Sequence, residues 1–218
     1  YPPPTFLLPL PFTLGCAALA ALFHRRLKNI TRDDMKKGAV IGLCLFAAYS
    51  SQTIGITDTT PGKNAFLTAV YCVIVPFLFW AVNKTRPDRY HLLSAVFCLT
   101  GIGFVSLTEG MTIRMGDALT LLGGFFFAVH MVAVARLARD KDPVLISILQ
   151  FGYAAILAWI TTLLLEPRPG ALKAETIGAI CFLSFGCTAL GLLLQNIGQK
   201  YTHPAAASVI LSLESVFG

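Results

Sequence analysis

The sequence predicts an all-α, polytopic transmembrane helix bundle built from two inverted five-helix halves. Three observations lead to this prediction. The 218 residues are 56% hydrophobic and 13% charged, with a mean hydropathy of +0.71, whereas a soluble domain carries about 25% charged residues. The apolar residues form eight separate segments, and one ten-residue element occurs twice. Because one soluble core cannot hide this much apolar sequence, we expect the chain to lie in a lipid bilayer.

Each of the eight apolar segments is interpreted as a membrane-spanning helix. Most approach the ~20 residues that a helix needs to cross a bilayer, and a helix satisfies its own backbone hydrogen bonds where lipid cannot. The connections between them are short and rich in Pro and charged residues, so no soluble domain fits there. The segments are residues 5–23, 38–57, 65–82, 91–108, 117–138, 144–165, 176–194 and 205–218.

The basic residues are distributed unevenly between the connections. Thirteen of the 17 Lys and Arg residues fall on one predicted side of the bundle, mostly in loops 24–37 and 83–90. Because cytoplasmic loops carry the excess of Lys and Arg, we predict that these two loops are cytoplasmic. The membrane that we expect is the plasma (inner) membrane of a bacterial-type cell. The net charge of +6 then reflects topology and contact with anionic lipid, and no nucleic-acid partner is expected.

Residues 52–61 (QTIGITDTTP) and 195–204 (QNIGQKYTHP) match at five of ten positions without a gap, 143 positions apart. Each copy begins near the end of one predicted span and stops where the next begins. An odd number of spans separates the copies, so they should face opposite sides of the membrane. Inverted repeats are typical of secondary transporters, whose substrate sites lie near the midplane between the halves.

The repeat divides the chain into two predicted halves, residues 1–108 and 117–218. At the 143-residue offset, span 117–138 lacks a partner before residue 1, and span 91–108 lacks one after residue 218. We therefore expect one further helix at each end, and an intact protein of roughly 280–300 residues.

Two ionisable residues lie deep in predicted spans and are candidates for proton coupling. Glu214 is ten positions into the last span, where an ionised carboxylate costs roughly 2.5–3.5 kcal/mol. We expect it to be neutral, paired or in contact with a wet cavity, and its repeat counterpart is Tyr71. The second candidate is His130. The alternatives are a protonated acid that clamps neighbouring helices and a packing histidine whose hydrogen bonds are satisfied.

Polar side chains gather around the first copy of the repeat and at its counterpart in the second half. They are candidates for lining a substrate path, but they could equally form interhelical hydrogen bonds worth ~0.6 kcal/mol on average. The candidates are Tyr49, Ser51, Gln52, Asn64, Thr68, Tyr71, Gln195 and Asn196.

Other chemistry finds little support in the sequence. The six Cys residues all lie in apolar spans without a CxxC or Cys/His pattern, so we expect small buried side chains and no metal or other cofactor. HExxH, GxSxG, paired-carboxylate and P-loop patterns are absent from the sequence, so an enzyme is not predicted. Pro9, Pro11 and Pro76 fall inside predicted spans, where proline favours a kink.

Two runs resemble EamA-type members of the drug/metabolite transporter superfamily. AAYSSQTIGITDTTPGKNAFLTAVYCVIVPFLFW (residues 47–80) is similar to the family's third and fourth helices, and QNIGQKYTHPAAASVILSLESVFG (195–218) to the matching element of the second half. Glu214 is the Glu of that element, whereas Ser215 replaces its usual Pro. The resemblance implies ten helices in two inverted halves, cytoplasmic termini, and export of small metabolites, amino acids or drugs.

The favoured hypothesis is a secondary-active exporter of small-molecule solutes, embedded in the lipid bilayer, with Glu214 or His130 carrying protons. The alternative is a non-transporting membrane protein, such as an assembly partner or sensor, in which neighbouring helices satisfy every group of a dry polar cluster. The sequence is also compatible with a homodimer.

Overall fold

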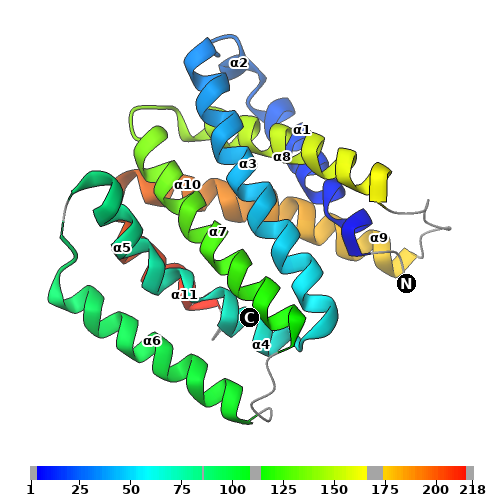
Figure 1. The fold of residues 1–218 in the computed structure, drawn as a ribbon. Coiled ribbons are helices and arrows are strands. Elements are labelled where there is room, and N and C mark those ends of the chain that lie inside the picture. Colours follow the sequence, from blue (N-terminus) through cyan, green and yellow to red (C-terminus); the bar gives the residue numbers. More distant parts are fainter. Residues whose placement is uncertain (1–3, 85, 109–113, 166–173, 215–218) are drawn as a thin grey trace. The chain divides into compact units, whose positions relative to one another are not determined.

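A computed structural model of the protein describes residues 4–84, 86–108, 114–165 and 174–214 (Figure 1). Within these ranges every regular element is a helix, so the predicted all-α membrane bundle is confirmed. The elements are η1 (Pro4–Leu7), α1 (Pro9–Leu22), α2 (His24–Leu27), α3 (Arg32–Gly55), η2 (Ile56–Asp58), α4 (Pro61–Thr68), α5 (Tyr71–Asn83), α6 (Arg89–Thr108), α7 (Met115–Leu137), α8 (Pro143–Leu165), α9 (Ala174–Cys181), the π-helix η3 (Phe182–Gly191), α10 (Leu192–Tyr201) and α11 (Pro204–Ser212).

Several of these helices are long and apolar enough to cross a membrane, which makes this a multi-pass membrane protein. Among the described residues five helical stretches meet that criterion, and three of them join consecutive elements. They are Arg32–Asp58, Pro61–Asn83, Met115–Leu137, Pro143–Leu165 and Thr176–Tyr201.

Side-chain caps explain where three of the helices begin. Thr31 and Asp34 form a reciprocal capping box at α3: the Asp34 amide donates to Thr31 Oγ1 at 3.2 Å, and the Thr31 amide donates to Asp34 Oδ2 at 2.9 Å. Asp142 accepts from the Val144 amide at the start of α8. Thr60 accepts from the Lys63 amide at the start of α4. The last two caps each precede a proline in the first helical turn, where proline loses no intrahelical hydrogen bond.

The chain folds into two compact units that do not follow the two sequence halves. The first unit contains Tyr1–Phe46 and Arg136–Tyr201, and the second contains Ala47–Ala135 and Thr202–Gly218. Each unit therefore combines a segment of the first predicted half with a segment of the second.

In the first unit, α1 packs against α8 and against the π-helix η3, and α10 packs against α8 (Figure 1). The rings of Phe12 and Phe151 stack between α1 and α8 with centroids 6.4 Å apart. Glycine allows α3 to approach α8 closely, since a Cβ on Gly42 would lie 2.8 Å from the carbonyl oxygen of Gln150. This is the close backbone approach that small residues permit in membrane helices.

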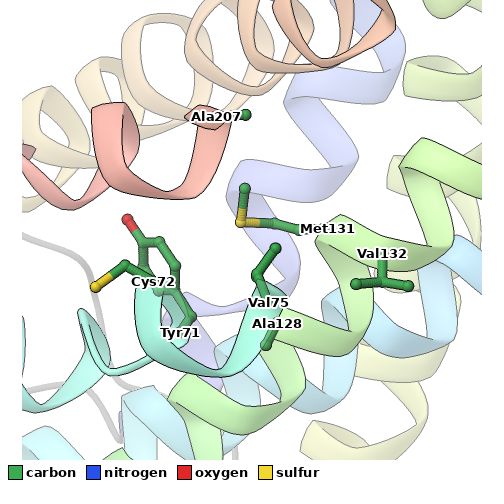
Figure 2. Packing of buried hydrophobic residues seen from close by; sticks show 7 residues of the cluster. All are labelled: Tyr71, Cys72, Val75, Ala128, Met131, Val132 and Ala207. Atoms are coloured by element: carbon green, nitrogen blue, oxygen red, sulfur yellow. The ribbon is translucent and has the colours of Figure 1, made fainter. Parts of the chain in front are cut away.

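In the second unit, α5 packs against α6 and α11. Its hydrophobic core combines side chains of α5, α7 and α11 (Figure 2). The buried members are Tyr71, Cys72, Val75, Ala128, Met131, Val132 and Ala207.

Three expectations from the sequence need correction. Pro9 and Pro11 do not kink a span, because α1 begins at Pro9 and both prolines lie in its first turn. The stretch Pro61–Asn83 is interrupted at residues 69 and 70, upstream of Pro76. Cys181 and Cys187 are exposed, while Cys72 is buried and Cys16 and Cys44 are half-buried; the side chain of Cys98 lies outside the described residues.

Candidate substrate path

Six of the eight candidate path residues belong to the second unit, and some of them contact one another. Gln52 on α3 donates from Nε2 to Thr68 Oγ1 on α4 at 3.2 Å. Asn64, one turn earlier on α4, donates from Nδ2 to Thr120 Oγ1 on α7 at 2.8 Å, and Thr120 donates in turn to the Gly116 carbonyl. Asn64 and Thr68 are buried, and Gln52 is half-buried.

The two tyrosine candidates converge on one aromatic ring that the sequence reading did not single out as a site residue. The ring of Tyr49 meets that of Phe127 edge to face at 5.1 Å, and Tyr71 lies 6.4 Å from the same ring. Phe127 comes from α7, so its contribution required the tertiary structure. The half-buried Ser51 lies on α3 between Tyr49 and Gln52 in sequence.

The other two candidates lie on α10 in the first unit. Asn196 donates from Nδ2 to Ser147 Oγ on α8 at 2.8 Å, and Ser147 donates to the Pro143 carbonyl at 2.8 Å. Asn196 is 3% exposed, and its Oδ1 has no partner among the described residues. The neighbouring candidate Gln195 is half-buried.

Gln199, one turn beyond Asn196 on α10, was not predicted from the sequence. It is 5% exposed, and neither amide atom finds a partner within the described ranges. Ser50 Oγ in the second unit is likewise buried without a partner there. Buried polar groups are hydrogen-bonded in the great majority of cases, so these amides and this hydroxyl retain hydrogen-bonding capacity for water or solute.

The two candidates for proton coupling differ sharply in environment. His130 is fully buried in α7, beside the core residues Ala128 and Met131. Glu214 lies just beyond the end of α11 and its side chain is exposed.

The sequence reading missed a buried ion pair in the second unit. Lys63 on α4 places Nζ 2.7 Å from Asp117 Oδ2 on α7, with side chains 10% and 4% exposed. Asp117 Oδ1 also accepts from Thr59 Oγ1 at 2.8 Å. A signal was available, because Asp117 was visible at the start of a predicted span, but Lys63 was counted only as a loop charge.

The first unit holds a more open charged cluster around the connection between α7 and α8. Lys141 Nζ lies 2.6 Å from Asp33 Oδ2 and 2.8 Å from Asp34 Oδ1 on α3. Hydrogen bonds to these two carboxylates raise the pKa of Lys141. The Lys200 ammonium on α10 donates to the Lys141 carbonyl at 2.9 Å.

The second copy of the repeat ends at a histidine with a different environment. The ring of His203, which precedes α11, stacks on His91 at 5.8 Å and meets the Phe79 ring edge to face at 5.2 Å. Desolvation, and then the neighbouring His91, lower the pKa of His203.

These features define a class: a helical multi-pass membrane protein with polar groups buried beside an interrupted span. The chain belongs to the EamA-like transporter family, whose model matches residues 1–107 and 114–218. The resemblance found in the sequence is therefore confirmed.

Two curated relatives are named as transporters of uncharacterised function. One, from Archaeoglobus fulgidus, is 31% identical over 188 residues, which cover 84% of this chain and 59% of the relative. The other, YyaM from Bacillus subtilis, is 22% identical over 203 residues, which cover 87% of this chain and 66% of the relative. The chain thus spans less than two thirds of the length of both relatives.

A solved crystal structure shares the fold. It aligns with a TM-score of 0.76 at 19% sequence identity, over 99% of this chain and 77% of the other.

Proposed function

We propose that the protein to which this chain belongs is a secondary-active transporter that exports small organic solutes, such as metabolites, amino acids or drugs, across a bacterial-type plasma membrane. Family membership and the names of the two relatives support this proposal. The proposed architecture is two inverted halves, residues 1–108 and 117–218, that expose the path to alternate sides of the membrane.

The observation that carries the proposal is the interruption between α4 and α5. Thr68 ends α4 and Tyr71 begins α5, and both polar side chains are buried at this break. Secondary transporters typically build substrate sites at discontinuous helices. At this turn the backbone stays hydrogen-bonded, since the Ala69 amide donates to the Ala65 carbonyl at 3.1 Å and the Cys72 amide to the Ala69 carbonyl at 3.0 Å, so the polar side chains are the groups proposed to meet the solute. A continuous apolar helix would anchor the chain in the bilayer equally well without this feature.

In this proposal the residues that line the path are Tyr49, Ser51, Gln52, Asn64, Thr68, Tyr71, Gln195 and Asn196. The unpartnered Asn196 Oδ1 and the two amide atoms of Gln199 favour a path that water or solute can complete. Uncharged hydrogen-bonding groups dominate these candidates, which favours solutes held by hydrogen bonds.

His130 is the stronger of the two proposed proton carriers. His130 is fully buried in α7, and ionisable groups inside membrane helices mark proton pathways in many transporters. Glu214 remains the second proposal, because its side chain is exposed and lies beyond the end of α11.

One observation favours the alternative, a non-transporting assembly partner or sensor. Gln52 pairs with Thr68, and Asn64 pairs with Thr120, as expected for dry interhelical contacts. The two hypotheses differ in what they predict for substitutions that remove a hydroxyl while keeping side-chain volume.

The test uses the full-length gene. Solute tolerance is screened in cells with and without it, and efflux of each responding solute is then measured in the parent and in Thr68→Val. We expect Thr68→Val to reduce efflux at least about tenfold, while Thr100→Val, on the exposed face of α6, stays at the parent rate. His130→Gln should abolish the pH dependence of efflux. If no solute responds, or if Thr68→Val matches the parent, the proposed transport path is wrong.

A further inference from the structure

The ion pair between Lys63 and Asp117 is embedded in a set of contacts that joins the first turn of α4 to the first turn of α7. Asp117 accepts from the Lys63 ammonium at 2.7 Å, from the Thr59 hydroxyl at 2.8 Å and from the Arg114 amide at 3.0 Å. Both carboxylate oxygens are therefore used, and the charges are almost completely removed from solvent.

Close contacts that involve the backbone join the end of α3 to the start of α7, next to the ion pair. Asp58 Oδ2 accepts from the Gly116 amide at 3.1 Å. A Cβ on Gly116 would lie 2.6 Å from the Gly55 carbonyl oxygen, and one on Gly55 would lie 2.5 Å from Thr120 Oγ1. The end of α3 and the start of α7 thus touch through positions that admit no side chain.

The element held by the ion pair is short, and a two-residue turn joins it to the helix that follows. Helix α4 is eight residues long, and its break from α5 falls at residues 69 and 70. The far end of α4 packs against Gly124 of α7, where a Cβ would lie 2.8 Å from the Thr68 carbonyl oxygen. The path candidates Asn64 and Thr68 are therefore buried behind the ion pair, on the same short helix.

The energetics of such a pair favour two discrete states. A buried pair is stabilising only while it is intact, because either charge left alone in a dry site is strongly unfavourable. Hydrating both charges at once removes that penalty, so the contact is either closed and dry or open and wet. An apolar contact of similar volume would hold the two helices together permanently just as well. Charges are useful where the contact must open, because water stabilises both of them once they separate.

We propose that α4 is a gate at this end of the second unit, and that the Lys63–Asp117 ion pair holds the gate closed. Movement of α4 about the break at residues 69 and 70 separates the charges and admits water to Thr68 and Gln52. The role of the gate in transport rests on the proposed function. Whether the gate exists is measured separately, by the access of water to Thr68.

The experiment measures that access in the full-length protein. Its native cysteines, including the six in this chain, are replaced by serine and Thr68→Cys is introduced. Permeabilised membranes are treated with methanethiosulfonate ethyltrimethylammonium, a charged thiol reagent that reacts with cysteines in contact with water. Permeabilisation lets the reagent reach both faces, so the result does not depend on the predicted topology.

We expect slow labelling of Thr68→Cys in the parent, and labelling at least about tenfold faster when Asp117→Asn or Lys63→Met is added, because the open state becomes more populated. Lys37→Met, which breaks a solvent-exposed pair with Asp33, is the matched control and should leave the rate unchanged. Ser184→Cys, fully buried in the first unit, reports any general loss of structure and should stay slow throughout.

Two results would overturn the gate. One is fast labelling of Thr68→Cys in the parent; the other is an unchanged rate in both charge variants while Ser184→Cys stays slow. If the charge variants also expose Ser184→Cys, Thr59→Val decides, since it removes one hydrogen bond to Asp117 and keeps both charges. Selective acceleration then supports the gate, and no acceleration contradicts it. A protein that fails every transport screen but shows gated labelling loses the proposed function and keeps the gate.

Discussion

The two copies of the repeated element, residues 52–61 and 195–204, share a backbone pattern but are held by different chemistry. In each copy a helix ends, the residue directly before a proline adopts an extended conformation, and that proline begins the next helix. The extended residues are Thr60 (φ −83°, ψ 151°) and His203 (φ −62°, ψ 135°), followed by Pro61 and Pro204. The backbone turn therefore depends on the element the copies share.

The side chains that follow the turn differ. Lys63 and Asn64, which follow the first copy, correspond to Ala206 and Ala207, which follow the second. The first copy is fixed by a buried ion pair and amide hydrogen bonds, whereas the second rests against the rings of Phe79 and His91. The turn is thus alike in the two copies while the contacts that close it differ, and matched substitutions in the two copies should have unequal effects.

The largest difference is expected at the ion pair. Lys63→Met leaves the Asp117 carboxylate buried without its counter-charge, and should lower the free energy of unfolding by about 3 kcal/mol. Thermal unfolding of the purified full-length protein in detergent measures this loss. Ala206→Met, at the corresponding exposed position, should change stability by no more than about 0.5 kcal/mol. Equal losses at the two positions would remove the proposed contrast.

The glycines shared by the two copies provide the next comparison. A Cβ on Gly55 would press against Thr120 and Gly116, but one on Gly198 would meet nothing within 4 Å. We expect Gly55→Ala to destabilise the protein by about 2 kcal/mol through overpacking. Gly198→Ala, inside α10, should be neutral or should stabilise by up to about 1 kcal/mol through helix propensity. The same unfolding measurement compares them, and a harmless Gly55→Ala would contradict the close contact with α7.

A smaller effect is expected at the helix caps. The Thr60 side chain accepts a hydrogen bond from the Lys63 amide, whereas His203 occupies the N-cap position of α11 and makes no side-chain hydrogen bond there. Thr60→Ala should therefore cost about 1 kcal/mol, and Thr60→Asn, which can still cap, should cost much less. If unfolding curves show that the two substitutions are equally damaging, the cap is not what Thr60 contributes.

The smallest expected effect is a dependence on pH in the second copy. The folded state lowers the pKa of His203, so below about pH 6.5, the usual pKa of histidine, the unfolded chain binds a proton that folded His203 resists. Stability from this residue is then present at neutral pH and decreases with acidification. His203→Gln should make the fall in Tm between pH 7.5 and 5.5 smaller. An unchanged pH dependence would show that the contact with His91 and Phe79 has no electrostatic consequence.

The helices were predictable because lipid exposure leaves a strong pattern in the sequence. The predicted segments 117–138 and 144–165 agree closely with α7 and α8, since long apolar stretches between charged or proline-containing connections have few alternatives. The break before Tyr71 was not predictable, because Ala69 and Val70 carry no turn signal. The π-helix η3 likewise was not predicted from the sequence pattern.

The candidate site was predictable only in its polar parts. Gln52, Asn64 and Thr68 stand out because polar residues are costly in lipid, but their partners depend on the fold. Thr120 and Lys63 are 56 and 54 positions from the groups they bind. The positive-inside rule uses a loop lysine only as an indicator of topology. It therefore gave no indication that Lys63 is buried in an ion pair.

Inverted duplication is the central claim, and labelling single cysteines from each face of intact cells tests it most directly. Gly62 in the first copy's loop is exposed with open space around its Cα, and Tyr201 in the second copy is 80% exposed, so cysteines at both positions should react freely with a membrane-impermeant reagent. We predict that Gly62→Cys reacts from outside the cell and Tyr201→Cys only from inside. Reaction of both from the same face would contradict the inversion.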